Sequence, residues 1–190
     1  MSTYLLASNN AGKLREFREI FTEDTILSLK DVSLEIEVEE DGTTFEENAI
    51  KKASEIARIS GMTAIADDSG LCVDALGGAP GVYSARYAGE DATDGERIEK
   101  LLEEMKDKTD RKAQFVSVVA LCTPDGKTVT AYGECEGEIL YEPMGEGGFG
   151  YDPIFHVKEF DKTFGQLSGE EKNSISHRGR AIRALKEKLQ

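Results

Sequence analysis

An apolar run that ends in two acids and two small residues occupies positions 64–70, and it reads Ala64-Ile65-Ala66-Asp67-Asp68-Ser69-Gly70. The apolar part predicts a strand, and the Asp, Ser and Gly that follow predict a turn at its end. Such an end holds carboxylates rigidly over backbone amides that can meet an anion. Because a hard cation prefers carboxylate oxygens, the paired aspartates also suggest a metal facing a phosphate. Taken alone, positions 67–70 are more typical of an ordinary strand end, and further clusters along the chain change that balance.

The size and charge of the chain exclude several classes of protein. Its 190 residues are enough for a hydrophobic core and predict one domain. The formal net charge of −14, with the lysines and arginines dispersed along the chain, argues against a nucleic acid partner. A polyanionic small molecule remains compatible with this charge, because cations at a site act locally.

The beginning of the chain and its cysteines indicate a cellular compartment. Residues 1–8 contain no basic segment, and no later apolar run reaches membrane-spanning length. We therefore expect a soluble, cytoplasmic protein that has no membrane partner. Cys72, Cys122 and Cys135 form no Cys-x-x-Cys pair, so we interpret them as small core residues and not as zinc ligands or disulfides.

Strand-like and helix-like stretches alternate through the first two thirds of the chain, which predicts an α/β or mixed α+β fold. The spacing of apolar residues predicts helices at 12–21, 44–60, from 93 onward and at 176–189. Thr44 with Glu47, and Thr93 with Glu96, have the form of capping boxes. Strands are predicted at 4–7, 113–123 and 128–140, and the glycine-rich residues 144–150 are predicted to be a loop.

A candidate phosphate site lies between the first predicted strand and the first predicted helix, in the stretch Ser8-Asn9-Asn10-Ala11-Gly12-Lys13. Helix amides and the helix dipole favour an anion there, and Lys13 adds a positive charge. The glycine spacing is not that of a Walker loop, and asparagine or serine at these positions can equally cap the helix.

Acidic residues precede the second predicted helix. A third carboxylate from Glu39, Glu40 or Asp41 could complete the metal site that Asp68 begins, or these acids could only favour the helix N-terminus. Lys52 lies two turns inside this helix, from where it reaches either a phosphate or solvent.

Two later clusters contain aromatic and cationic residues. Residues 149–153 place Phe149 and Tyr151 in a glycine-rich loop, where aromatic rings either stack on a base or anchor the loop to the core. Residues 172–178 gather lysine, arginine and hydroxyl groups before the last helix. We interpret His177 as a hydrogen-bonding group, because no second histidine or cysteine is placed to complete a zinc site. His156, within an apolar stretch, is interpreted as structural.

Taken in order, these motifs resemble the inosine triphosphate pyrophosphatase family over almost the whole chain. The motifs are residues 8–13, 44–49, 67–71, 77–87, 149–153 and 176–178. The resemblance implies a single domain over residues 1–190 with an elongated mixed β-sheet, flanking helices, and two lobes with a central substrate cleft. It also implies a homodimer that hydrolyses ITP, dITP and XTP to the monophosphate and pyrophosphate, with Mg²⁺, or alternatively Mn²⁺, as cofactor.

The resemblance also assigns roles to residues at the matching positions. Asp68 would be the general base and a metal ligand, and Glu39 would be a second metal ligand. Asp67 would support these ligands without contacting the metal itself. The triphosphate would be held by Ser8, Asn9, Asn10, Ala11, Gly12, Lys13, Lys52 and Ser69. The nucleobase and sugar would be surrounded by Phe149, Gly150, Tyr151, Asp152, Lys172, His177 and Arg178.

Two other functions fit part of the pattern. A haloacid-dehalogenase-like phosphatase also uses aspartates after a strand, but it needs an Asp-x-Asp spacing that the adjacent Asp67-Asp68 pair does not have. A nucleotide-sensing module would keep the base platform and the phosphate cradle without a water-activating carboxylate. The pyrophosphatase releases pyrophosphate, whereas a phosphatase releases orthophosphate directly. Replacement of Asp68 by asparagine distinguishes the enzyme, which should lose turnover, from a sensing module.

Overall fold

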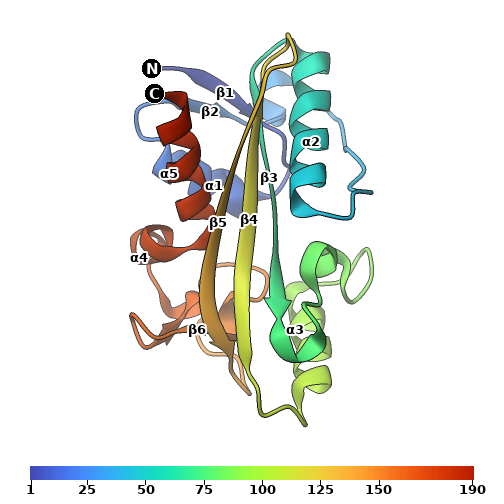
Figure 1. Cartoon of the computed structure of the whole chain (residues 1–190), viewed down its shortest axis with the longest axis vertical. Coiled ribbons are helices and arrows are strands. Elements are labelled where there is room, and N and C mark those ends of the chain that lie inside the picture. Colours follow the sequence, from blue (N-terminus) through green and yellow to red (C-terminus); the bar gives the residue numbers. More distant parts are fainter. The chain divides into compact units, whose positions relative to one another are not determined.

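Seven strands form one mixed sheet in the computed structural model, which describes residues 1–190 (Figure 1). The order of the strands is β2-β1-β3-β4-β5-β6-β7, in which β1 pairs in parallel with β2 and β3, and β6 pairs antiparallel with β5 and β7. The strands are β1 Thr3–Leu6, β2 Thr25–Leu27, β3 Ala64–Val73, β4 Lys112–Cys122, β5 Thr128–Ile139, β6 Phe155–Val157 and β7 Lys162–Thr163. The predicted mixed α/β fold class is confirmed.

Five α-helices accompany the sheet: α1 Ala11–Ile20, α2 Phe45–Ser60, α3 Asp94–Met105, α4 Gly169–Ile175 and α5 His177–Leu189. Five short 3₁₀ turns join them: η1 Lys30–Val32, η2 Asp74–Leu76, η3 Gly81–Arg86, η4 Asp152–Ile154 and η5 Phe164–Gln166. None of the helices combines the length and the apolar character that a membrane crossing requires.

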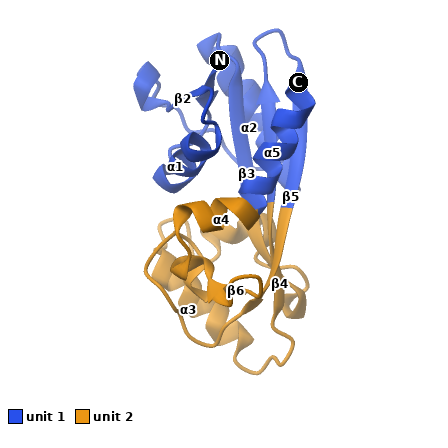
Figure 2. Cartoon of the chain, turned by 90° about the vertical axis from the view of Figure 1, so that its left-hand side faces the viewer, with its two compact units in different colours: residues 1–68, 117–133, 177–190 blue, residues 69–116, 134–176 orange.

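The chain divides into two compact units, coloured separately in Figure 2. Unit 1 contains residues 1–68, 117–133 and 177–190, and unit 2 contains residues 69–116 and 134–176. The chain passes from one unit to the other four times, within β3, β4 and β5 and between Ser176 and His177. The single domain predicted over residues 1–190 stays a prediction.

Unit 1 has two apolar clusters that use opposite faces of its strands. Val118, Ala120 and Cys122 of β4 pack in one cluster with α2, whereas Val119 and Leu121 pack in the other with α1 and α5. This alternation follows from the period of two along a strand. The sheet of unit 1 is therefore covered by α2 on one face and by α1 and α5 on the other.

Unit 2 has its own core, which is rich in aromatic residues. The ring centroids of Phe115 and Phe155 lie 4.5 Å apart, and those of Phe155 and Phe164 lie 5.0 Å apart. Ile98, Leu101 and Met105 of α3 are buried in the same cluster. This core holds the strands and turns that carry the residues 149–152.

The close packing of α5 on β5 requires a glycine at position 133. A Cβ atom at Gly133 would lie 2.2 Å from the carbonyl oxygen of His177 and 2.4 Å from the amide nitrogen of Ala181. Because both neighbours are helix backbone, the helix itself would have to move. Gly133 therefore fixes how near the N-terminal turns of α5, which carry His177 and Arg178, approach the sheet.

The structure corrects three local predictions. The predicted turn at residues 67–70 is wrong, because β3 continues to Val73 as a largely buried strand whose acidic side chains have polar partners. The capping box at Thr44 is incomplete, since the carboxylate of Glu47 accepts from the amide of Thr43 instead. Helix α4 was not anticipated, because seven residues are too few to show a clear helical period.

Candidate active site

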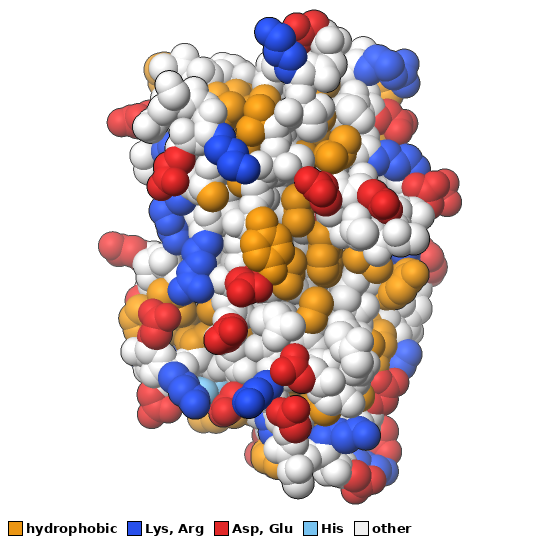
Figure 3. All heavy atoms as spheres, in the orientation of Figure 1, with side chains coloured by type: hydrophobic (Ala, Val, Ile, Leu, Met, Phe, Trp, Pro, Cys, Tyr) orange, Lys and Arg blue, Asp and Glu red, His pale blue; other side chains and the backbone are white.

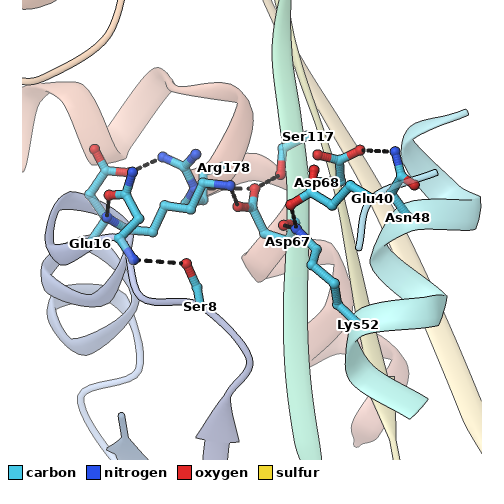
Figure 4. Close-up of polar contacts among 11 residues, drawn as sticks. Ser8, Glu16, Glu40, Asn48, Lys52, Asp67, Asp68, Ser117 and Arg178 are labelled. Carbon is cyan, nitrogen blue, oxygen red and sulfur yellow. Dashed lines mark hydrogen bonds and ion pairs between the residues drawn. The ribbon is translucent and has the colours of Figure 1, made fainter. Parts of the chain in front are cut away.

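Asp67 is the centre of a buried set of charges in unit 1 (Figure 4). Its carboxylate lies 2.7 Å from the ammonium of Lys13 and 3.2 Å from Nε of Arg178, and it accepts a hydrogen bond from the hydroxyl of Ser117 at 2.9 Å. Burial alone would raise the pKa of Asp67, but the charges of Arg178 and Lys13 outweigh it and hold this pKa well below its usual range. Asp67 is therefore an ionised, fully engaged carboxylate.

Asp68, the next residue of β3, has a different environment. Its carboxylate accepts a hydrogen bond from the side-chain amide of Asn48 at 3.0 Å, and the residue is 3% exposed. Burial and the nearby carboxylate of Glu40 raise the pKa of Asp68 to about 6, against the opposing charges of Lys52 and Lys13. The adjacent aspartates therefore differ: Asp67 is held ionised by cations, whereas Asp68 titrates close to neutral pH.

Lys52 links α2 to this strand. Its ammonium donates to the backbone carbonyl of Asp67 at 2.7 Å and to the carboxylate of Glu40 at 2.9 Å, and Lys52 is 6% exposed. The sequence left open whether Lys52 reaches solvent, and the structure buries it at the strand. Burial raises the pKa of Glu40, but the charge and hydrogen bond of Lys52, together with the charge of Lys13, lower this pKa overall.

Glu40 and Glu39 are placed differently. Glu40 is half-buried and contacts Lys52, whereas Glu39 is exposed and acts electrostatically on Lys51. The structure therefore brings Glu40 toward Asp68. The assignment of a metal ligand to Glu39 stays a prediction.

Two side chains of the predicted phosphate loop accept hydrogen bonds from backbone amides of the same loop. Asn10 caps α1 by accepting a hydrogen bond from the amide of Lys13 at 3.0 Å, and Ser8 accepts from the amide of Asn10 at 3.1 Å. Asn9 and Ala11 are exposed, and Gly12 is half-buried. Burial lowers the pKa of Lys13 more than the neighbouring Asp67 raises it. The loop thus contains both the N-terminus of α1 and the partly desolvated ammonium of Lys13.

Arg178 and His177 begin α5, and both are buried. The guanidinium of Arg178 pairs with Glu16 of α1 as well as with Asp67. These two carboxylates outweigh the effect of burial and raise the pKa of Arg178. These two contacts of Arg178 join the start of α5 to α1 and to β3.

The aromatic loop belongs to unit 2. The ammonium of Lys172 lies 2.7 Å from the carboxylate of Asp152 and 4.6 Å from the centroid of the Phe149 ring. Asp152 also accepts from the amide of Phe149 at 2.9 Å, and the amide of Gly150 donates to Asp94 at 3.0 Å. This buried pair and its amide contacts give the loop a defined shape.

The two aromatic residues of this loop differ. Phe149 is half-buried, whereas Tyr151 is 4% exposed and donates its hydroxyl to the carbonyl of Ser84 at 2.7 Å. The side chain of Tyr151 therefore anchors the loop, the second of the two readings open from the sequence. Ser69, predicted to hold phosphate, is half-buried on β3 in unit 2.

Several residues of the site were not anticipated from the sequence, namely Glu16, Asn48, Ser84, Asp94 and Ser117. Glu16 had one signal: it stands beside Phe17 within the apolar pattern of α1, where an acid needs a partner. The others are ordinary polar residues of helices, turns and strands, and only their contacts distinguish them.

The geometry defines a class of protein. Two lysines, an arginine and three carboxylates converge on one strand of a mixed α/β sheet, which is an arrangement suited to a polyanion that is accompanied by a cation. The chain belongs to the Ham1 family, whose profile matches residues 4–188.

Curated relatives and solved structures agree with this membership. The dITP/XTP pyrophosphatase of Nostoc sp. is 54% identical, with coverage of 97% of this chain and 93% of that protein. The dITP/XTP pyrophosphatase of Clostridium perfringens is 50% identical, with coverage of 100% and 98%. The structure of the Ham1 protein of Staphylococcus aureus has a TM-score of 0.88 at 49% identity, with coverage of 100% of this chain and 98% of that one. The resemblance proposed from the sequence motifs is confirmed.

Proposed function

We propose that this chain is a nucleoside triphosphate pyrophosphohydrolase, which hydrolyses dITP, XTP and ITP to the nucleoside monophosphate and pyrophosphate. Relatives at 50–54% identity over nearly the whole chain carry the name dITP/XTP pyrophosphatase. The observation that carries the proposal is the unequal pair on β3, in which Asp67 is held by cations and the pKa of Asp68 is raised to about 6.

The chemistry follows from these two environments. Asp68 is largely ionised at neutral pH yet close enough to its pKa to take a proton from an attacking water, as a general base must. Lys13 and Lys52 offset the charge of the triphosphate, and the helix N-terminus at residues 10–13 favours phosphate oxygens. Water attacks the phosphorus that remains in the nucleoside monophosphate, and the bond from this phosphorus to the pyrophosphate leaving group breaks. No covalent intermediate is required.

The residues present fit a magnesium or manganese ion. No group of three or more His, Cys, Asp or Glu side chains is arranged to hold a metal. Mg²⁺ is commonly bound by one or two carboxylates and completed by water and phosphate oxygens. Asp68 and Glu40 supply two such carboxylates, and burial together with repulsion from Glu40 raises the pKa of Asp68. When bound, the ion supplies Lewis-acid stabilisation of the phosphate oxygens and the pyrophosphate leaving group.

The nucleobase is assigned to the aromatic loop of unit 2. A half-buried Phe149 ring is suited to stacking on a base, and Asp152 and Lys172 are charged groups beside it. A site that donates a hydrogen bond to a 6-keto oxygen rejects adenine, because the 6-amino group would leave two donors facing one another. A donor at that position would therefore favour inosine and xanthosine over adenosine nucleotides.

The proposal also includes a homodimer, which the family resemblance implies, and a cytoplasmic location without a nucleic acid or membrane partner, which the charge and hydropathy of the sequence favour. The net charge of −14 supports the absence of a nucleic acid partner. On the face shown in Figure 3, acidic and basic side chains are interspersed. Sedimentation at several protein concentrations tests the homodimer.

The function is tested with a panel of nucleoside triphosphates in the presence of Mg²⁺. We expect ITP, dITP and XTP to give monophosphate and pyrophosphate much faster than ATP, CTP or UTP. Orthophosphate as the first product would indicate a phosphatase, and equal rates with all bases would contradict the proposed selectivity. Binding of ITP without any turnover would favour a nucleotide sensor.

A further inference from the structure

Glu16 is a buried acid on α1 that no part of the proposed mechanism uses. It is 3% exposed, and a carboxylate in that position requires a compensating cation. The cation is Arg178, whose guanidinium pairs with the Glu16 carboxylate (Figure 4). These residues are 162 positions apart in the chain, so the pair forms only when α5 packs against α1.

The pair is the beginning of a longer row of charges. Nε of Arg178 lies 3.2 Å from one carboxylate oxygen of Asp67, and the other oxygen of Asp67 lies 2.7 Å from the ammonium of Lys13. The sign of the charge alternates along the row, which runs through Glu16, Arg178, Asp67 and Lys13. It contains two anions and two cations, so its formal charges cancel.

Removal of the charge on Glu16 would change how the carboxylate of Asp67 is divided between its two cations, Arg178 and Lys13. Asp67 would then face Arg178 and Lys13, and the planar guanidinium fork can take both oxygens of one carboxylate. Arg178 would compete with Lys13 for the oxygen that Lys13 now contacts. Lys13 would lose the contact that fixes its ammonium beside the N-terminus of α1.

We propose that Glu16 is a positioning residue for the triphosphate, which acts through Arg178 and Asp67 to hold the ammonium of Lys13 in place. The proposal rests on the proposed function in one respect, namely that Lys13 contacts the phosphates. In this proposal Arg178 acts within the protein interior. Asp67 transmits the effect of Glu16 from Arg178 on α5 to Lys13 on α1.

A double-mutant cycle tests this proposal. The dissociation constant of inorganic triphosphate is measured by calorimetry, with Mg²⁺ present, for wild type, Glu16→Gln, Lys13→Met and the double variant. We expect Glu16→Gln to weaken binding about tenfold in the wild-type background. In the Lys13→Met background the same change should alter binding less than about twofold, because the group on which it acts is gone.

Two further measurements separate positioning from general damage. Glu19→Gln removes one charge from an exposed site on the same helix and should leave triphosphate binding within about twofold of wild type. With ITP, Glu16→Gln should raise KM about as much as it weakens triphosphate binding, and the ratio of kcat/KM between ITP and ATP should stay unchanged.

The outcomes are distinct from those that test the proposed function. Equal effects of Glu16→Gln in both backgrounds, or no effect in either, would overturn the proposal, as would a wild type that does not bind triphosphate. If Glu16→Gln does not fold, the cycle is run with Glu16→Asp, which keeps the charge but shortens the side chain, and the same criterion decides. A wild type that binds triphosphate but hydrolyses no purine nucleotide would refute the enzyme, while the cycle would still decide the role of Glu16.

Discussion

The side-chain amide of Asn48 donates a hydrogen bond to the carboxylate of Asp68 at 3.0 Å, and this contact joins the first turn of α2 to the centre of β3. It holds one oxygen of Asp68 and orients the carboxylate. Asn48 is 1% exposed, so the contact is shielded from solvent. The orientation of the proposed base is therefore set by a helix that follows the acidic segment of residues 39–41.

Replacement of Asp68 by asparagine should abolish turnover while nucleotide binding is largely retained. The amide preserves size but cannot take a proton, and loss of a general base costs about 10²- to 10⁴-fold in rate. Initial rates with ITP and calorimetric binding measure the two effects. Asp74→Asn, at an exposed acid just beyond the same strand, is the matched control. Wild-type turnover in the Asp68 variant would contradict the catalytic role.

The metal-free protein should lose stability as the pH rises through the range from about 4 to about 6. The folded pKa of Asp68 is raised from 3.8 to about 6, so its protonated form stabilises the fold below about pH 4, and this stabilisation is lost above about pH 6. The shift corresponds to about 3 kcal/mol. Urea unfolding of wild type and Asp68→Asn in EDTA measures it. We expect the variant to gain relative stability across this window, and parallel curves would refute the raised pKa.

Glu40 should matter more than Glu39 for the dependence on Mg²⁺. Glu40 approaches Lys52 and raises the pKa of Asp68, whereas Glu39 is exposed. Glu40→Gln should raise the Mg²⁺ concentration needed for half-maximal activity at least about tenfold, and Glu39→Gln should change it less than about twofold. A titration of activity against Mg²⁺ decides between them. The reverse order would restore the assignment made from the sequence.

The pair of Lys172 and Asp152 should be strongly coupled. Both side chains are about 5% exposed and their charged atoms lie 2.7 Å apart, so loss of one partner leaves an uncompensated buried charge. Lys172→Met should cost about 3–5 kcal/mol of unfolding free energy, and Lys172→Met with Asp152→Asn should cost less than the sum of the single changes. Urea unfolding of the four proteins measures the coupling. Additive losses would show that the ion pair contributes nothing.

Gly133→Ala should destabilise the protein by about 1–3 kcal/mol, because the added methyl would meet the backbone of α5. The matched control is Gly95→Ala in α3, where the nearest atom to the new methyl lies 3.8 Å away. Since alanine is the better helix former, this control should be neutral or stabilising by up to about 1 kcal/mol. Thermal unfolding of both variants gives the comparison, and equal stability of the two would contradict the close packing of α5 on β5.

Helices with strong local signals were predictable from the sequence. Thr93 and Glu96 form the expected capping box at the start of α3. The helix predicted at 44–60 ends at Ser60, and Gly61 follows it in a left-handed conformation. The strands predicted at 113–123 and 128–140 are present as the neighbouring strands β4 and β5. These features depend on neighbours within a few residues, so their causes are visible in the local sequence.

The end of β3 was not predictable in the same way. Aspartate, serine and glycine at residues 67–70 favour a turn, but the strand continues because Asp67 and Asp68 find partners on α1, α2 and α5. Tertiary contacts thus override the local preference. For the same reason the residue types alone do not separate Glu39 from Glu40, and the assignment of Glu39 came only from the family resemblance.

The order of the motifs along the chain was enough to determine the family, the mixed α/β class and the set of residues worth testing. Only the tertiary structure decided how the charges are shared: Asp67 pairs with Arg178, 111 positions away, and Arg178 pairs with Glu16, 162 positions away. The physical reason is that burial and Coulomb interactions depend on distance in space, which a linear pattern of residue types does not contain. Two adjacent aspartates that are identical in sequence therefore acquire opposite pKa shifts in the folded protein.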